Sequence, residues 1–482
     1  MIWWLPAAGH ATLRVAATLI ALLPFACAVL LRLRARTRTG DVHRRGVLLA
    51  DGRNAVRRAR RRRLAGAERL TLAGVDIAPL DEVKHFKVIG TTGTGKSTAI
   101  QELLAGAIGR GDRAVIADPD GGYMRRFFAP YRGDVLLNPF EPGSVRWDWC
   151  AEIHDRYDVE QLASGLIPSS ADASGQEWRG YARTFFNAVA RRCRDGNRRS
   201  AAELWRLLTV ASSEELRPLV AGTPAQPFLD PDNARMFGSI RSVTGSAVAA
   251  LEHIEAQRAA PFSVRHWVRD CRAPGSLYIP YKAGQIAALR SMIAAWLRLA
   301  IFEAMNGAED RDQRLWVIVD ELDALGAIDG LKDALARLRK FGGRCVIGLQ
   351  SIAQVSSTYG GGDAQTIVEN CGNTLILRCA SSENGGTSQF ASKLIGEREV
   401  RRRQTARNRE RAGWLSKGGA RRSTNISEQF VTEAAVMPSE IEQLADLRGY
   451  LKRASSPAWF KVALRPPPFA AARGFFTAGG AP

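Results

Sequence analysis

Cysteine and histidine are scarce in this sequence of 482 residues, with seven and six copies, and neither residue is grouped. No Cys-x-x-Cys pair occurs, and no histidine lies at the spacing of a zinc site. A dispersed, odd set of cysteines in a long chain is typical of thiols in a reducing compartment. The scarcity argues against a disulfide scaffold and against a structural metal site.

Acidic residues are also in short supply, with 48 Asp and Glu against 68 Lys and Arg, which gives a formal net charge of +20. A surplus of this size favours a polyanionic partner, which is nucleic acid, an anionic lipid surface, or both. An ordinary solvated surface rich in arginine is the alternative, and composition alone does not decide between them. The hydrophobic fraction of 46% is typical of a folded globular chain.

Long uncharged stretches are rare, and the one that stands out is Val15–Leu31. As a helix it would span ~26 Å at ~1.5 Å per residue, against a hydrocarbon core of ~30 Å. Arginines follow it directly, and the positive-inside rule then places the rest of the chain in the cytoplasm. We therefore predict a transmembrane anchor within residues 1–35. A cleaved signal peptide fits less well, because no small-residue cleavage site follows the apolar run.

Thirteen arginines lie within residues 32–63, and most of them fall in a basic juxtamembrane segment that we assign to residues 36–69. The simplest interpretation is a topology signal that is also attracted to lipid headgroups. A contact with DNA is the second interpretation, and the sequence leaves both open.

An alternation of strands and helices begins at about residue 70. Apolar runs predict strands, and amphipathic runs predict the helices between them. The predicted strands are 85–90, 113–119, 134–140, 276–280, 315–321, 344–351 and 373–379, and the predicted helices are 98–108, 285–305 and 330–341. This alternation implies an α/β fold with a parallel sheet and crossover helices.

Residues 150–265 lack strand-like runs and show helical periodicity, so we predict an all-α domain there. It would interrupt a nucleotide-binding domain formed by residues 70–149 and 266–465. The Pro-rich residues 466–482 are expected to form a flexible tail. The basic stretch 396–423 has few apolar positions and is predicted to be a loop, either a DNA contact or simply solvated.

Gly90–Ser97 reads GTTGTGKS and matches the P-loop pattern GxxxxGK[ST] in full. Phosphates need several converging backbone N–H donors, and glycines let the chain wrap closely enough to supply them. Lys96 is expected to reach the β- and γ-phosphates of ATP, and the Ser97 hydroxyl to bind Mg²⁺. The following helix points its N-terminus at the anion. The predicted nucleotide-binding residues are Gly90, Thr92, Gly93, Thr94, Gly95, Lys96, Ser97 and Thr98.

The run LWVIVDE at residues 315–321 is a buried strand that ends in two acids. Beside a P-loop, Asp320 is expected to hold Mg²⁺, and Glu321 to polarise the water that attacks the γ-phosphate. Without a P-loop, the same pattern would be read as a strand followed by an acidic turn that caps a helix. The acidic pair favours an ATPase over a small kinase or a GTPase.

Two further residues are candidates for the catalytic set. Gln350 ends the strand 344–351 and would sense the γ-phosphate if that strand lies beside the strand of Asp320; otherwise it is a strand-end hydrogen-bonding group. Arg339, on the intervening helix, could reach the ATP of a neighbouring subunit as an arginine finger, or it could be a solvated residue at a helix end. The competitors of Arg339 for the finger role are Arg337, Lys340 and Arg344.

Several segments occur in an order that resembles the type IV coupling proteins of bacterial conjugation, and within them the TraD/TrwB-like branch. They are HFKVIGTTGTGKST, VIADPDGGYMRRF, LLNPF, QEWRGYART, RLWVIVDELDAL, GRCVIGLQSIAQVSSTYG and VMPSEI. The resemblance covers most of residues 80–465. It implies a RecA-like nucleotide domain, a membrane-distal all-α domain and a homohexameric ring at the bacterial inner membrane.

The same resemblance implies a function. Such proteins use ATP to move single-stranded DNA, with its attached relaxase, into a type IV secretion channel. Lys96, Asp320, Glu321, Arg339 and Gln350 match the family's P-loop, Walker B, finger and sensor positions.

One departure from the family concerns the membrane. Coupling proteins usually have two transmembrane helices, whereas this sequence offers one clear span, so either the first helix is reduced to Ile2–Leu13 or the anchor is single. Two rival functions also stay open. One is another hexameric ATPase that moves duplex DNA or protein, and the other is a non-hydrolysing DNA-binding adaptor that uses ATP only to assemble.

Overall fold

The structure is a computed structural model of the chain. It describes residues 42–64, 69–170, 172–196, 198–270, 274–310, 313–382, 385–409 and 422–466, with the backbone alone at 403–409 and 422–426. The chain divides into one unit of residues 1–48 and 396–435 and another of residues 49–395 and 436–482. The predicted anchor at 15–31 lies outside the described residues. Within the described ranges, no helix is long and apolar enough to cross a membrane.

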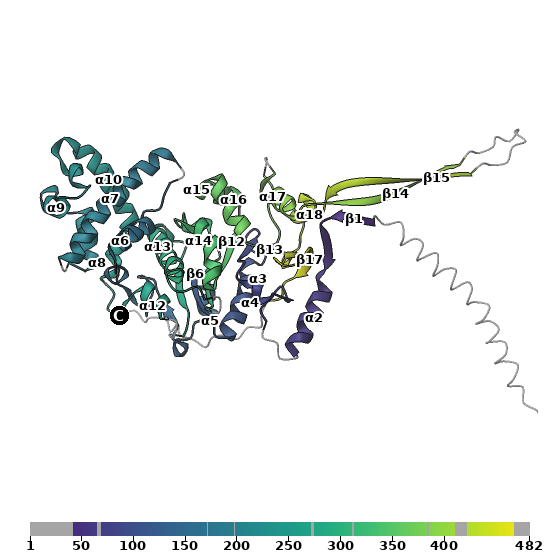
Figure 1. Cartoon of the computed structure of the whole chain (residues 1–482), viewed down its shortest axis with the longest axis horizontal. Coiled ribbons are helices and arrows are strands. Elements are labelled where there is room, and N and C mark those ends of the chain that lie inside the picture. Colours follow the sequence, from purple (N-terminus) through teal and green to yellow (C-terminus); the bar gives the residue numbers. More distant parts are fainter. Residues whose placement is uncertain are drawn as a thin grey trace, which may run out of the picture. The chain divides into compact units, whose positions relative to one another are not determined.

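The larger unit is built on a mixed sheet whose strand order is β2-β17-β16-β13-β5-β12-β11-β6-β10-β7. Figure 1 labels β6, β12, β13 and β17 of this sheet. Strands β13, β5, β12, β11, β6, β10 and β7 run parallel, and β16 and β17 continue the sheet in antiparallel fashion. Their bounds are β2 (Leu48–Asp51), β5 (Phe86–Ile89), β6 (Arg113–Pro119), β7 (Val135–Leu136), β10 (Leu277–Tyr281), β11 (Leu315–Val319), β12 (Gly343–Leu349), β13 (Asn373–Ile376), β16 (Arg448–Lys452) and β17 (Ala458–Ala463).

The central strands read as continuous apolar runs because both faces of the sheet are covered by helices. Every residue of β5, β11 and β12 is buried. The flanking helices include α4 (Lys96–Gly109), α5 (Gly122–Phe127), α13 (Ile286–Ala304), α14 (Leu331–Leu338) and α16 (Gly361–Asn370). Phe86 and Val88 of β5 pack in one core with Ile100 and Leu103 of α4, so α4 is held against the strand that precedes it in the chain.

The all-α domain groups α6 (Arg156–Leu166), α7 (Ala173–Asp195), α8 (Ala201–Thr209), α9 (Ser213–Val220), α10 (Ala234–Val248) and α11 (Leu251–Ile254). Figure 1 labels α6 to α10, in blue to teal. Local sequence explains where several helices begin. Asp172, Ser200 and Ser212 each accept a hydrogen bond from a backbone N–H in the first turn of α7, α8 and α9. Short parallel strands β8 (Arg146–Trp147) and β9 (Pro261–Phe262) pair where this helical region joins the sheet.

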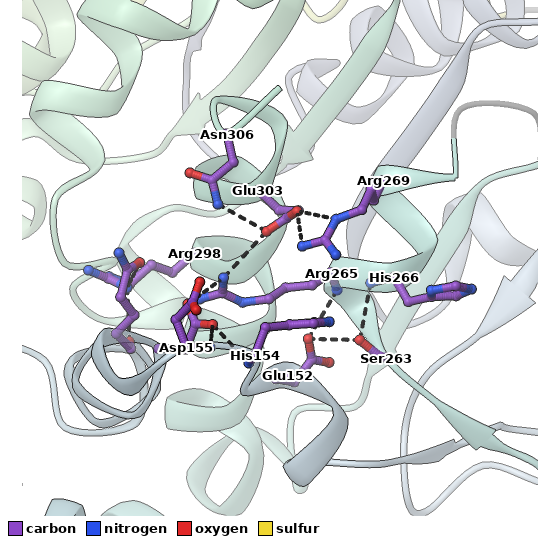
Figure 2. Close-up of polar contacts among 12 residues, drawn as sticks. Glu152, His154, Asp155, Ser263, Arg265, His266, Arg269, Arg298, Glu303 and Asn306 are labelled. Atoms are coloured by element: carbon purple, nitrogen blue, oxygen red, sulfur yellow. Dashed lines mark hydrogen bonds and ion pairs between the residues drawn. The ribbon is translucent and has the colours of Figure 1, made fainter. Parts of the chain in front are cut away.

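A buried polar junction ties the all-α domain to the core (Figure 2). Glu152 is fully buried and accepts hydrogen bonds from the Ser263 hydroxyl at 3.0 Å and from the backbone N–H groups of Val264 and Arg265 at 2.6 and 3.0 Å. Burial raises the pKa of Glu152, and these donors oppose that shift. Glu152 therefore fixes the start of α12 (Val264–Arg269).

Arg265 forms the second half of the junction. Its guanidinium lies 2.8 Å from Asp158 of α6 and 3.3 Å from Glu303 of α13, and all three side chains are buried. Glu303 also receives the more exposed Arg269 at 2.8 Å (Figure 2). The junction therefore joins α6, α12 and α13 through charges that are almost fully removed from water.

The smaller unit contains an antiparallel sheet of order β1-β14-β15, formed by β1 (Val42–Gly46), β14 (Glu397–Arg409) and β15 (Arg422–Ala434). The predicted loop over 396–423 was therefore wrong for residues 397–409 and 422–423, which are strand. Among the described side chains of β14 and β15, Val400 is the one buried apolar residue, so burial gives these strands no hydrophobic period there. Cross-strand ion pairs such as Arg398–Glu433 at 2.9 Å accompany the backbone ladder instead.

Candidate nucleotide site

The P-loop connects the carboxyl end of β5 to the start of α4. Gly93 and Gly95 have φ of +77° and +114°, a region that other residues rarely adopt. A Cβ at Gly95 would also lie 2.8 Å from the Leu447 side chain. The chain can wrap here because these two positions are glycine, and the wrap brings the loop to the N-terminus of α4, where backbone N–H groups favour an anion.

Lys96 is buried at the first position of α4. Its ammonium donates hydrogen bonds to the carbonyl oxygens of Gly90 at 2.8 Å and Thr91 at 3.3 Å. Burial lowers the pKa of Lys96, while the charges of Asp320 and Glu321 oppose the shift. The cation is thus held inside the loop, beside the two acids of the Walker B strand.

Ser97 and Asp320 meet across 223 positions of sequence. The Ser97 hydroxyl donates to Oδ2 of Asp320 at 2.7 Å, and the Tyr123 hydroxyl donates to the same oxygen at 2.7 Å. The other carboxylate oxygen, Oδ1, is buried and has no hydrogen-bond partner among the described residues. A serine hydroxyl and a carboxylate with a free oxygen are ligands that Mg²⁺ accepts, so the site fits this ion.

The protein supplies few ligands for a metal by itself. In the part of the chain that the structure describes, no cluster of three or more His, Cys, Asp or Glu side chains could hold a metal ion. A Mg²⁺ ion bound here would depend on Ser97, Asp320 and the phosphates of a nucleotide, which is how Mg²⁺ is usually held in such sites.

Gln350 links the P-loop to Glu321. Its amide nitrogen donates to the Glu321 carboxylate, and its amide oxygen accepts from the Thr92 hydroxyl at 3.2 Å. Strand β12 lies between β5 and β11, so the condition set for a sensor role of Gln350 is met. Burial, followed by the charge of Asp320, raises the pKa of Glu321.

These side chains meet because the parallel strands end at one edge of the sheet. Val319 of β11 pairs with Ile347 of β12, and Leu349 of β12 pairs with Ile89 of β5. The residues that directly follow these strands therefore lie together at their carboxyl ends, where ligands bind in open α/β sheets.

Tyr123 belongs to the site and was not predicted. Asp118, at the carboxyl end of β6, accepts hydrogen bonds from the backbone N–H groups of Tyr123 at 3.0 Å and Met124 at 2.6 Å, which fixes the start of α5. Burial raises the pKa of Asp118 to about 7. The strand 113–119 was predicted, and since it ends at the same edge as β11, the residues after it could have been included.

Arg339 lies away from the nucleotide site in the structure. It is exposed in the short 3-10 helix Arg339–Phe341, directly before the amino end of β12. Gln350 follows the opposite end of that seven-residue strand, which is roughly 20 Å long at ~3.3 Å per residue. Arg339 is therefore not part of the site within one chain.

The competitors of Arg339 differ in their environment. Arg344 is buried and pairs with Glu82 at 3.1 Å, so its side chain is held in the core and cannot reach another subunit. Lys340 lies 3.6 Å from Glu309 on the surface. Arg337 is exposed on α14, so Arg337 and Arg339 have the freer positions for reaching another subunit.

A cavity of about 330 Å³ adjoins the P-loop on the side of Gln350. It is lined by Thr91, Thr92, Gln350, Ser351 and residues 380–382 and 386–387, among others. Its walls carry several hydroxyl and amide groups, which suits a polar ligand group next to the phosphate-binding loop.

The sequence matches the family described as type IV secretion-system coupling protein DNA-binding domain over residues 69–465. The chain belongs to this family of coupling proteins. Among curated coupling proteins and their relatives, it is 32% identical over 323 residues to coupling protein TraD of Escherichia coli (strain K12), covering 66% of this chain and 44% of that protein. It is 22% identical over 421 residues to conjugal transfer protein TraG of Escherichia coli, covering 76% of this chain and 65% of that protein. The chain thus spans less than half the length of TraD.

Solved structures of a coupling protein share the fold. The unbound form of the bacterial conjugative coupling protein TrwB lacking its N-terminal segment has 30% identity and a TM-score of 0.79, covering 90% of this chain and 96% of that one. TrwB in complex with ADP and Mg²⁺ has 29% identity and a TM-score of 0.78, covering 90% and 97%. The prediction of a RecA-like α/β fold with an all-α domain is confirmed.

Proposed function

We propose that this coupling protein is an ATPase that joins a relaxase–DNA complex to a type IV secretion channel and moves single-stranded DNA. The observation that carries the proposal is the meeting of Lys96, Ser97, Asp320, Glu321 and Gln350 at one sheet edge of a chain that belongs to the coupling proteins. TrwB, which shares the fold, has been solved with ADP and Mg²⁺ and with non-hydrolysable analogues of ATP and GTP.

Each residue of the site has a separate role in ATP hydrolysis. The P-loop N–H groups and Lys96 would bind the phosphates of ATP, and Ser97 and Asp320 would hold the Mg²⁺ ion. When bound, Mg²⁺–ATP supplies the phosphoanhydride bond that is cleaved. Glu321 accepts a proton from the attacking water. Its raised pKa suits this role, because a general base works best when its pKa approaches the working pH.

Gln350 is positioned to sense whether the γ-phosphate is present. Its amide bridges Glu321 and the P-loop hydroxyl of Thr92, so a change at either end alters its hydrogen bonds. Arg339 would complete the site from a neighbouring subunit in a homohexameric ring, which would place each ATP at a subunit interface.

The partners and location are part of the same proposal. The net charge of +20 suits non-specific contact with a DNA phosphate backbone. An anchor over residues 15–31 would hold the chain at the bacterial inner membrane, with the described residues on the cytoplasmic side.

Replacement of Glu321 by Gln distinguishes an ATPase that moves DNA from an adaptor that binds ATP without hydrolysing it. We expect Glu321→Gln to bind ATP normally and to lose hydrolysis by about 10²–10⁴-fold, because the general base is gone while the phosphate contacts stay. Nucleotide binding by fluorescence titration and phosphate release measure the two effects. DNA transfer in cells that is equal to wild type with Glu321→Gln would favour the non-hydrolysing adaptor.

A further inference from the structure

Helix α2 (Gly52–Leu64) carries seven arginines in 13 residues and is fixed to the core of the larger unit. Gly52 and Ala59 are buried, and Ala55 and Val56 pack against the hydrophobic core. A Cβ at Gly52 would lie 2.4 Å from the carbonyl oxygen of Lys461, so the helix begins in close contact with β17. The small and apolar positions of α2 are thus used for packing.

The opposite face of α2 is almost wholly arginine. At 3.6 residues per turn, Arg53, Arg57, Arg60 and Arg61 fall on the half of the helix that faces away from Ala55 and Ala59, and Arg58 lies at the edge of that half. All five side chains are exposed. Asn54 and Leu64 are the other residues on this face, so α2 presents a continuous cationic surface.

Four of these arginines have no acidic partner among the described residues, namely Arg57, Arg58, Arg60 and Arg61. By contrast, Arg53 lies 3.7 Å from Asp51, and Arg62, on the side of Ala55 and Ala59, lies 3.5 Å from Asp76. The positive potential of the four is therefore not neutralised within the described chain. Like charges crowded on one face repel one another, and an external polyanion would relieve that repulsion.

The distribution of apolar residues favours nucleic acid over a lipid surface. A helix that binds a membrane turns an apolar face to the acyl chains, but the apolar residues of α2 face the core, and Leu64 alone points outward. A signal for membrane topology needs only a basic composition, and it does not require the arginines to share one face of a helix. A folded helix with a rigid arginine face suits a line of phosphates.

We propose that α2 is a sequence-independent contact for the phosphate backbone of single-stranded DNA. The helix precedes residue 69, where the match to the family's DNA-binding domain begins. The inference rests on the proposed function, because it adds a second place where the transported strand touches the protein, away from the nucleotide site.

The test compares the salt dependence of DNA binding by the full chain in detergent. Each phosphate neutralised on a single strand contributes about 0.7 to the slope of log K against log salt. The combined variant R57Q/R58Q/R60Q/R61Q should lower that slope by about 2 to 3, and R57K/R58K/R60K/R61K should keep it. R191Q/R199Q/R217Q/R235Q removes the same charge from exposed positions of the all-α domain and should leave the slope near wild type.

Each other result overturns the proposal. An equal fall in the α2 and all-α variants would show an effect of net charge alone. An unchanged slope combined with loss of co-purified anionic phospholipid would assign α2 to the membrane. ATP binding and thermal unfolding are measured on every variant to show that it is folded. Absence of DNA binding by the wild type would contradict the proposed function itself, which separates the two failures.

Discussion

Asp320 shows how single residues set up the site. One of its carboxylate oxygens accepts from Ser97 and Tyr123, which come from two different helices, and the other is left for an additional ligand. Hydrogen bonds to charged groups contribute about 1.5–3 kcal/mol each, so the two hydroxyls hold the carboxylate in one orientation. The strand 315–321 predicted the position of Asp320, whereas Tyr123 lies on α5 after the predicted strand 113–119, and no motif singled it out.

His85 provides a pH test at the residue scale. It is buried, its Nε2–H donates to the carbonyl oxygen of Leu335 at 2.8 Å, and its Nδ1 accepts from the backbone N–H of Cys345 at 3.1 Å. Burial lowers the pKa of His85 to about 4. Between about pH 4 and 6.5 the unfolded chain therefore binds a proton that the folded chain does not, and stability falls as the pH falls.

Because of His85, the free energy of unfolding should fall by about 3 kcal/mol when the pH is lowered from 7 to 4. Urea unfolding across that range measures the loss, and His85→Gln should flatten the profile while lowering stability at pH 7. A profile of His85→Gln that is as steep as that of the wild type would show that other groups cause the acid sensitivity.

At the scale of elements, the sheet and its crossover helices could be predicted from the sequence, since buried parallel strands are continuous apolar runs. The strands β14 and β15 could not, because Arg and Glu side chains dominate the first and the hydrophobic pattern is missing. The short strands β16 and β17 were also missed; they extend the sheet near the P-loop, where Leu447 donates its N–H to the carbonyl of Thr94 at 2.9 Å.

The junction of α6, α12 and α13 should be sensitive to the loss of one charge. Arg265→Met would leave Asp158 and Glu303 buried without their shared cation, at a cost of about 3–5 kcal/mol. Arg269→Met removes a cation from the same Glu303, but Arg269 is half exposed, and the cost should stay within about 1 kcal/mol. Chemical denaturation of both variants gives the comparison, and equal losses would contradict the account of the junction.

At the scale of the whole molecule, the separation of Arg339 from Gln350 by the length of β12 predicts that a complete site needs two subunits. Arg339→Ala and Glu321→Gln should each be almost inactive alone. A mixture should regain ATP hydrolysis, because some interfaces then combine an intact Glu321 with an intact Arg339. A mixture of Lys96→Ala with Glu321→Gln should stay inactive, since both changes disable the same side of the interface. No recovery in the first mixture would show that Arg339 does not act across subunits.

The most direct test of the central claim is ATP hydrolysis by the full chain in detergent, with and without single-stranded DNA, over a range of salt concentrations. A motor that couples hydrolysis to DNA should be strongly stimulated by DNA, should lose that stimulation as salt weakens phosphate contacts, and should be inactive as Lys96→Ala. Hydrolysis that is indifferent to DNA at every salt concentration would contradict the claim and would favour an ATPase that moves protein.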